Sequence, residues 1–234
     1  MLVLALDTCD GRGSIALVDG LHTLGEILHL EGDDYSTWLL PQVDKLLHEH
    51  RVSHSDLAGY AVASGPGSFT GVRVGLTTAK AWSEIYSKPI YPISRLAVLA
   101  QSAPASAEYA GVFIDAQRSQ IFAALYRRSA AGWQTAIQDS VISPIDFFSA
   151  CAEAAEGSSL AWVSLDPEIL STSSFGQSLQ QQRTAPIITV YPPFAAALGK
   201  LALCNPVPTD ALSLDANYVR RSDAEIFGKK AAHP

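Results

Sequence analysis

Two aspartates stand where a carboxylate at the end of a strand could do chemistry. Asp7 follows the apolar segment Leu2–Leu6, and Asp115 follows the apolar segment Gly111–Ile114. A carboxylate in such a place could hold a metal ion or orient a water molecule, or it could bond to its own backbone two residues on and shape a turn. Neither aspartate has a partner histidine or glutamate nearby. We therefore favour the turn role and expect no catalytic residue at either position.

A glycine-rich turn at residues 65–71 lies between a strand-like segment and a long helical pattern, where phosphate-binding loops also lie. The Walker loop, the dinucleotide fingerprint and the nucleophile elbow each need a glycine where Thr70 stands, and the elbow needs another where Pro66 stands. The only cation nearby is Arg73. We predict a tight turn in which Ser68 or Thr70 caps the following helix, with no cofactor bound.

The histidines and cysteines lack the spacing of a metal site. His48, His50 and His54 cluster where the first helix should end, and the helix dipole favours cations there. No acidic ligand completes a zinc set around them. The sequence therefore predicts no metal. The cysteines lie far apart, as small buried thiols in a reducing compartment do, and predict no disulfide framework; they are Cys9, Cys151 and Cys204.

The elements that must position these residues form two similar series. Short apolar runs separated by Gly and Asp predict three strands within residues 2–30 and a helix from near Tyr35 to His48. The first half continues with a strand at 59–64, a helix at about 70–86, a strand at 89–93 and a helix capped by Ser94. The second half repeats the plan, with strands near 111–115, 119–127, 133–142, 160–165 and 187–190, and helices near 144–156 and 192–203.

This repetition predicts an α/β protein of two tandem lobes, each with a central mixed sheet and helices on its faces. The small, polar segment at 104–108 is the best candidate for a linker. We therefore expect an N-terminal lobe at residues 1–103, a C-terminal lobe at residues 104–215 and a tail at residues 216–234.

The helix predicted at about 70–86 is small or apolar on more than one side. One side carries Leu76 and Ala79, and another carries Val74 and Ala81. A helix of this kind is covered on more than one side. One side must pack on the sheet, and the other meets either a neighbouring helix of this chain or another protein.

Composition limits the class of partner. The 234 residues include 16 Lys and Arg against 23 Asp and Glu, which gives a formal net charge of −7. This balance disfavours direct binding to a nucleic-acid backbone. Charged residues make up only 17% of the chain, so a partner could cover part of the surface. Neither a leader nor a membrane span is evident, and we expect a cytoplasmic protein.

Five segments match the motifs of one family: Leu4–Thr8, Leu39–Pro41, Ser64–Lys80, Ile114–Arg118 and Tyr218–Glu225. The run Gly-Pro-Gly-Ser-Phe-Thr-Gly-Val-Arg at residues 65–73 is the most specific of them. On these residues the chain resembles the bacterial TsaB (YeaZ) family. The resemblance implies an actin-like (ASKHA) fold with two RNase H-like lobes. It also implies a role in forming threonylcarbamoyladenosine, the modified adenosine next to the anticodon of tRNA.

The resemblance also implies partners. In this family TsaB is a catalytically silent subunit that pairs with the TsaD-like transferase, and a TsaE-like ATPase binds the complex, so tRNA is met only through the complex. Without this partner, the chain should form a homodimer through the apolar patch that would otherwise pair with the transferase. The pairing helices correspond to residues of about 35–48 and 70–86, and we expect the following partner-interface residues: Tyr35, Trp38, Leu39, Gln42, Val74, Thr77, Thr78 and Ala81.

Two absences in the sequence separate the chain from enzymes of the implied fold. The helix near residues 94–103 lacks the histidines that hold the metal in TsaD-like proteins, and the turn after Asp115 lacks the glycines of the ASKHA kinase phosphate loop. The alternative is an ASKHA-type enzyme, such as a metallopeptidase-like (glycoprotease) or sugar-kinase-like hydrolase. Many members of the family have a histidine where Tyr35 stands, so its affinity for the partner could differ.

Overall fold

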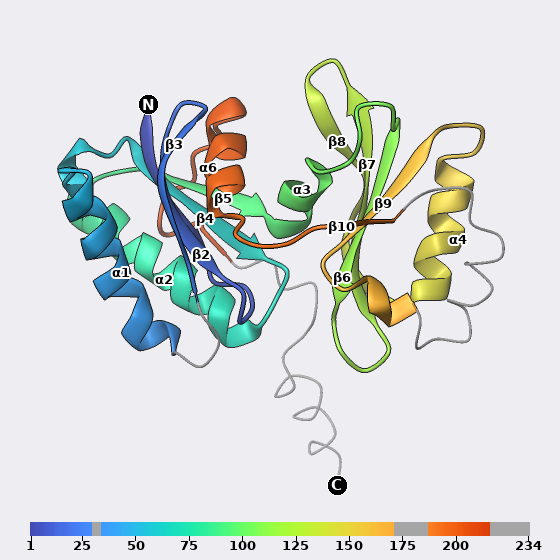
Figure 1. Cartoon of the computed structure of the whole chain (residues 1–234), viewed down its shortest axis with the longest axis horizontal. Helices are drawn as coiled ribbons and strands as arrows, with labels where there is room; N and C mark the ends of the chain where they lie inside the picture. Colours follow the sequence, from blue (N-terminus) through green and yellow to red (C-terminus); the bar gives the residue numbers. More distant parts are fainter. Residues whose placement is uncertain (30–33, 171–186, 216–234) are drawn as a thin grey trace, which may run out of the picture.

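The computed structural model describes residues 1–29, 34–170 and 187–215. Two sheets stand beside each other, with a short helix between them and longer helices on their outer faces (Figure 1). The tail expected at residues 216–234, which includes the family segment Tyr218–Glu225, lies outside the described residues. Within the three described ranges, none of the helices combines the length and the apolar character needed to cross a membrane.

Five strands form the first sheet in the order β3-β2-β1-β4-β5: β1 (Leu2–Asp7), β2 (Ser14–Asp19), β3 (His22–Leu28), β4 (Gly59–Gly65) and β5 (Ile90–Ser94). The first three strands are an antiparallel meander, β4 runs parallel to β1, and β5 runs parallel to β4. The central strand β1 is apolar without alternation up to Asp7 and is covered on both faces, as its sequence predicts.

Five strands form the second sheet in the order β10-β9-β6-β7-β8: β6 (Tyr109–Asp115), β7 (Ile121–Ser129), β8 (Gly132–Ile142), β9 (Leu160–Ser164) and β10 (Ile187–Thr189). Its first three strands are again an antiparallel meander, β9 runs parallel to β6, and β10 runs parallel to β9. The repeated order is the RNase H-like topology. It confirms the predicted α/β, actin-like (ASKHA) fold with two lobes built on mixed sheets.

Two long helices, α1 (Tyr35–Glu49) and α2 (Phe69–Tyr86), cover one face of the first sheet (Figure 1). Each helix turns an apolar stripe toward the sheet, with Val43 and Leu46 buried in α1 and Val72 and Leu76 buried in α2. Of the two sides of α2 described above, the one with Leu76 and Ala79 packs on the sheet.

The opposite face of the first sheet is covered by α6 (Ala195–Cys204) (Figure 1). A Cβ added to Gly199 would lie 2.9 Å from Cγ2 of Val18 on β2 and 3.2 Å from Cβ of Ala5 on β1. The helix therefore presses directly on the sheet, which requires a residue without a side chain at this position.

The path of α6 corrects the predicted extent of the C-terminal lobe, residues 104–215. After β10 the chain returns to the first lobe, where the hydroxyl of Ser14 accepts hydrogen bonds from the N–H groups of Phe194 (3.1 Å) and Ala195 (3.0 Å). Farther along, the N–H of Thr209 donates to the carbonyl of Ile90 on β5 (2.8 Å). The second sheet is thus an excursion between two segments that build the first lobe.

The second lobe has its own apolar core beneath α4 (Pro144–Ala154). Phe148 on this helix meets Trp162 of β9 edge-on at 4.3 Å between ring centroids. The helix begins at Pro144, as predicted. The hydroxyl of Ser143, which was not predicted as a cap, accepts from the N–H of Asp146 (3.2 Å). The short helix α3 (Arg95–Ala100) contacts both sheets and carries the core from one lobe to the other.

The glycine-rich turn is explained by close packing. As predicted, the hydroxyl of Ser68 caps α2, accepting from the N–H of Gly71 (3.4 Å). A Cβ on Gly71 would lie 2.1 Å from the carbonyl oxygen of Thr8, and one on Gly67 would lie 2.3 Å from that of Cys9. Thr8 Oγ1 donates to the carbonyl of Gly71 (2.6 Å). The glycines therefore allow the start of α2 to lie on the turn that follows β1.

Replacing Gly71 with alanine should destabilise the first lobe, because the new methyl group meets backbone rather than a movable side chain. We expect Gly71→Ala to lower the free energy of unfolding by about 1–3 kcal/mol, measured by urea denaturation. Gly11→Ala is the matched control, since a Cβ at Gly11 would meet nothing within 4 Å. Equal stabilities of the two variants would contradict this account of the turn.

Candidate functional site

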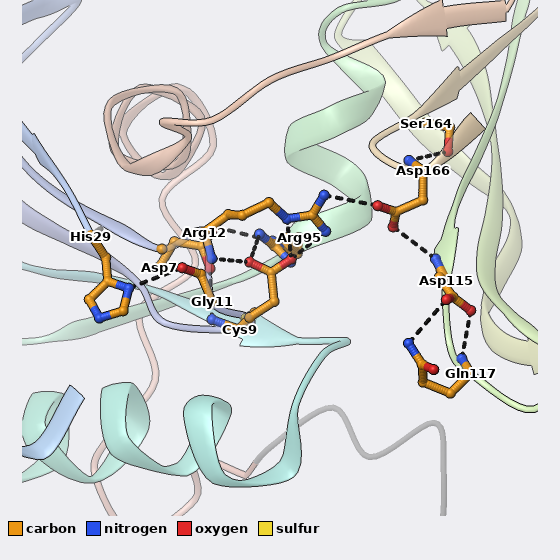
Figure 2. A network of polar contacts seen from close by, with 12 residues as sticks. Asp7, Cys9, Gly11, Arg12, His29, Arg95, Asp115, Gln117, Ser164 and Asp166 are labelled. Carbon is orange, nitrogen blue, oxygen red and sulfur yellow. Dashed lines mark hydrogen bonds and ion pairs between the residues drawn. The ribbon is translucent and has the colours of Figure 1, made fainter. Parts of the chain in front are cut away.

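A buried ion-pair network occupies the place where the two lobes face each other (Figure 2). Its centre is Arg95, the first residue of α3, which Ser94 positions by capping the helix as predicted. Arg95 Nε donates to Asp7 Oδ2 (3.1 Å), and its two Nη atoms donate to the carboxylate of Asp10 (2.7 and 2.9 Å). The side chains of Arg95 and Asp7 are 1% and 0% exposed. One guanidinium thus faces two carboxylates, and Asp10 also pairs with Arg12 (2.8 Å).

The electrostatics of the network favour the charged forms of Arg95 and Asp10. Burial alone would lower the pKa of Arg95, but the charges of Asp7 and Asp10 raise it above its ordinary value. Burial alone would raise the pKa of Asp10, but Arg95 and then Arg12 lower it from 3.8 to about 2. These are reciprocal effects of one close contact between opposite charges.

The predicted turn role of Asp7 is confirmed, because its Oδ1 accepts from the N–H of Cys9 (3.0 Å). The ion pair with Arg95 is an addition that sequence reasoning missed. A signal was available: Arg95 stands in the first turn of a short apolar helix, where the helix dipole disfavours a cation. A cation at such a position requires carboxylates close by.

The second lobe contributes a matching turn. Asp115 Oδ1 accepts from the N–H of Gln117 (2.7 Å), which confirms the turn role predicted for this aspartate as well. The N–H of Asp115 donates to Asp166 Oδ2 (3.1 Å), and Asp166 Oδ1 accepts from Arg12 Nη1 (2.8 Å). Figure 2 shows Arg12 reaching from the first lobe to Asp166 in the second. The two strand-end aspartates are therefore linked through a chain of ion pairs that ends in the hydrogen bond from the N–H of Asp115 to Asp166, and their carboxylates do not converge on one shared atom.

Guanidinium groups occupy the space beside the carboxylates of this network. Asp7, Asp10 and Asp166 all face a guanidinium, so a metal ion would have to displace Arg95 or Arg12. Among the residues that the structure describes, no group of three His, Cys, Asp or Glu side chains could hold a metal ion.

The adjacent thiol of Cys9 is a poor nucleophile in this setting. Burial, and then the charge of Asp7, raise its pKa well above the ordinary value. The thiol therefore stays protonated, 3.8 Å from the carbonyl of Ala63.

The histidine cluster divides between two environments. His48 lies in the last turn of α1, and His50 follows it as the C-terminal cap, so both lie at the end of the helix, as the sequence predicts. His54 instead lies in a separate 3-10 helix (His54–Asp56), stacked on Tyr86 with 4.7 Å between ring centroids. Its Nδ1 is 3.0 Å from the hydroxyl of Tyr60, and burial lowers its pKa. His54 is thus a packed aromatic residue rather than a solvated cation.

A second candidate site is the outer surface of α1 and α2, which we call the α1–α2 face and define by the residues predicted to meet a partner. The structure corrects two of them: Trp38 is 7% exposed and Leu39 is 1% exposed, so both belong to the core of the first lobe. Of the others, Thr77 and Ala81 are exposed, and four are half-buried: Tyr35, Gln42, Val74 and Thr78.

The predicted partner-interface residues leave out two exposed apolar side chains on these helices. Ile85, 69% exposed, extends the row of Thr77 and Ala81 by one helical turn, and Leu40 on α1 is 50% exposed. The error at Leu39 and Leu40 is one of helical phase, since adjacent leucines differ by about 100° around the axis. Which of two neighbouring leucines faces the sheet depends on how the helix is docked.

Removing the buried guanidinium should leave uncompensated carboxylates. We expect Arg95→Met to lower the free energy of unfolding by about 3–5 kcal/mol, measured by urea denaturation at neutral pH. Adding Asp7→Asn should restore part of the loss, because the neutral amide still accepts from the N–H of Cys9. Arg127→Met, at an exposed position on β7, is the control. An Arg95→Met protein as stable as the parent would show that the ion pair does not support the fold.

The same network predicts a defined response to acid. The pKa of Asp10 is lower in the folded chain than its ordinary 3.8, so its contribution is fully present above that value and is lost as the pH falls through about 2. From about pH 5 to pH 2, Asp10 should account for a loss of about 2 kcal/mol in the free energy of unfolding. Urea titrations of Asp10→Asn should lack this loss, whereas the exposed control Asp34→Asn should retain it. Identical acid profiles for the parent and Asp10→Asn would contradict the assignment.

Comparison with known proteins gives the family of the chain. A family model described as "TsaD: tRNA N6-adenosine threonylcarbamoyltransferase" matches residues 30–178. The tRNA threonylcarbamoyladenosine biosynthesis protein TsaB of Bacillus subtilis is 33% identical over 127 residues, which cover 54% of this chain and 56% of that protein. TsaB of Escherichia coli is 32% identical over 148 residues, covering 62% and 63%. The chain thus spans less than two thirds of the length of these relatives.

Solved structures agree in fold. YeaZ from Pseudomonas aeruginosa superposes with a TM-score of 0.70 and 23% identity, covering 93% of this chain and 99% of that one. An uncharacterized protein of the same organism, described as similar to peptidase YEAZ, gives a TM-score of 0.72 and the same identity. The chain therefore belongs to the family described as tRNA N6-adenosine threonylcarbamoyltransferase TsaD, and the relatives and the fold that it matches are those of TsaB (YeaZ) proteins.

Proposed function

We propose that this protein is a non-catalytic subunit that binds and supports a TsaD-like transferase in the threonylcarbamoyladenosine modification of tRNA. The relatives named TsaB support the pathway. The observation that carries the non-catalytic role is the position of Arg95. Its guanidinium fills the space between Asp7 and Asp10, beside the strand end where a carboxylate of an actin-like enzyme could hold a metal ion or orient water.

The α1–α2 face supports the partner role. It combines exposed small side chains, Thr77 and Ala81, with the exposed aliphatic side chain of Ile85. Small residues let the ridges of a partner helix come close, and aliphatic residues gain free energy when they leave water. We propose that the partner-interface residues are Tyr35, Gln42, Val74, Thr77, Thr78 and Ala81, extended by Ile85.

The other partners that we propose are a second copy of the chain, a TsaE-like ATPase and, through the complex only, tRNA. Alone, the chain would pair with a second copy through the α1–α2 face, because an apolar patch that lacks its usual partner tends to self-associate. In the complex, the TsaE-like ATPase would bind the assembled pair in the cytoplasm. With a net charge of −7, the chain would meet tRNA only through the complex.

A charge on the α1–α2 face should weaken pairing with the TsaD-like protein of the same organism. We expect Ala81→Glu, and likewise Val74→Glu, to raise the Kd at least about tenfold, which is about 1.4 kcal/mol, because the carboxylate would be desolvated against apolar surface. Isothermal titration calorimetry measures the Kd, and formation of the modified nucleoside by the complete enzyme set should fall in parallel. Ala152→Glu, at an exposed position on α4 of the second lobe, is the matched control.

Two outcomes would redirect this proposal. Unchanged affinity in Ala81→Glu would show that the partner uses another surface. Metal-dependent peptide hydrolysis by the purified chain alone, abolished by a chelator, would favour the metallopeptidase-like alternative over the silent subunit.

A further inference from the structure

The turn between β1 and β2 is held on one side by the first helix. The hydroxyl of Tyr35, the first residue of α1, accepts from the N–H of Gly13 (2.8 Å) and donates to the carbonyl of Asp10. His29 adds a contact between its Nδ1 and the carbonyl of Gly11 (3.0 Å), and its ring stacks on that of Tyr35. The backbone of residues 10–13 therefore follows the position of the start of α1.

The same turn reaches the second lobe with a side chain. Arg12 donates to Asp10 (2.8 Å) and, across the gap between the lobes, to Asp166 (2.8 Å). Asp166 is fixed in its own lobe, because its N–H donates to Ser164 Oγ (3.0 Å) and its Oδ2 accepts from the N–H of Asp115 (3.1 Å). Figure 2 shows this continuous path from Arg12 to the ends of β6 and β9.

The two arginines of the network differ in how readily their ion pairs can break. Arg95 is 1% exposed and faces buried carboxylates, so separating it from them would strand charges away from water. The side chains of Arg12 and Asp166 are 36% and 16% exposed, so water and ions can reach this pair and replace it. The pair of Arg12 and Asp166 is an ion pair that joins the two lobes.

We propose that Arg12 and Asp166 form a breakable latch that sets the relative position of the two lobes, and that the Tyr35 hydroxyl couples this latch to α1. A displacement of α1 moves the backbone of Asp10 and Gly13 and thereby moves the guanidinium of Arg12. Conversely, opening of the lobes pulls on the start of α1. The coupling is reciprocal, as any linkage between two equilibria must be. That a partner protein exploits it rests on the proposed function, whereas the latch itself does not.

Distances between the lobes test the latch in the isolated chain. Cys204, exposed at the end of α6 on the first lobe, and Ser149→Cys, exposed on α4, provide two spin-label sites, while Cys9 and Cys151 are buried. Pulsed electron double resonance with excess unlabelled chain measures the distances within one molecule. We expect Arg12→Gln to shift or broaden the distance distribution. Asp166→Asn should reproduce that change without altering the contacts that Tyr35 makes with the turn.

The coupling to α1 is tested by Tyr35→Phe, which keeps the ring and removes the hydroxyl. We expect a change in the same direction as that of Arg12→Gln, and no further change when the two are combined. Tyr109→Phe on β6 is the matched control. Salt of about 1 M, where the Debye length is about 3 Å, should shift the parent distribution toward that of Arg12→Gln and leave Arg12→Gln itself unchanged.

Each possible result tests either the latch or its coupling to α1. A distribution unchanged in Arg12→Gln and Asp166→Asn overturns the latch, and one unchanged in Tyr35→Phe alone overturns the coupling to α1. Because these measurements need no partner protein, a failure of the proposed partner role would leave them standing. A failure of the latch would likewise leave the effect of Ala81→Glu on pairing intact.

Discussion

The guanidinium of Arg95 is almost inaccessible to water, so it must be surrounded by negative charge. This requirement determines the structure at the centre of the protein. It demands that β1 end in Asp7, that the next turn bring Asp10 back toward α3, and that α3 begin where β5 stops. These elements come from distant parts of the first lobe, so the ion pair is available only when they are docked together. Helix α3 then lies against both sheets, and the same contact that neutralises Arg95 also anchors the junction between the lobes.

The close approach of α2 to the turn after β1 is the second constraint. Gly67 and Gly71 allow backbone to meet backbone there, so the most family-specific run of the sequence is explained by packing in this chain. That packing leaves the opposite side of α2 toward solvent, with Thr77, Ala81 and Ile85 along it. The glycines thus act indirectly on the α1–α2 face, because they determine how far that face stands from the sheet.

Local features were the predictable part of this molecule. The strands, the caps at Ser68 and Ser94 and the turns at Asp7 and Asp115 depend on neighbours in the sequence, which a reader of the sequence can see. The placement of α6 was predicted wrongly, because an apolar sequence pattern indicates that a helix is buried but not which sheet it packs against. The same limit applied to Arg95, whose partners are 88 and 85 residues away, and to Trp38 and Leu39, whose burial depends on how α1 is rotated on the sheet. The partner-interface residues that remain stay a prediction.

The return of the chain to the first lobe has a consequence for how the protein is made. The face of β1 and β2 that α6 covers is assembled from residues near the start of the chain, but its cover is synthesised almost 200 residues later. During translation this apolar surface stays uncovered while the whole second sheet is synthesised, so the first lobe of the nascent chain is incomplete until α6 leaves the ribosome. Chaperones can bind the exposed apolar surface during that interval. A chain that ends before Ala195 would lack α6, so this face of β1 and β2 would stay uncovered.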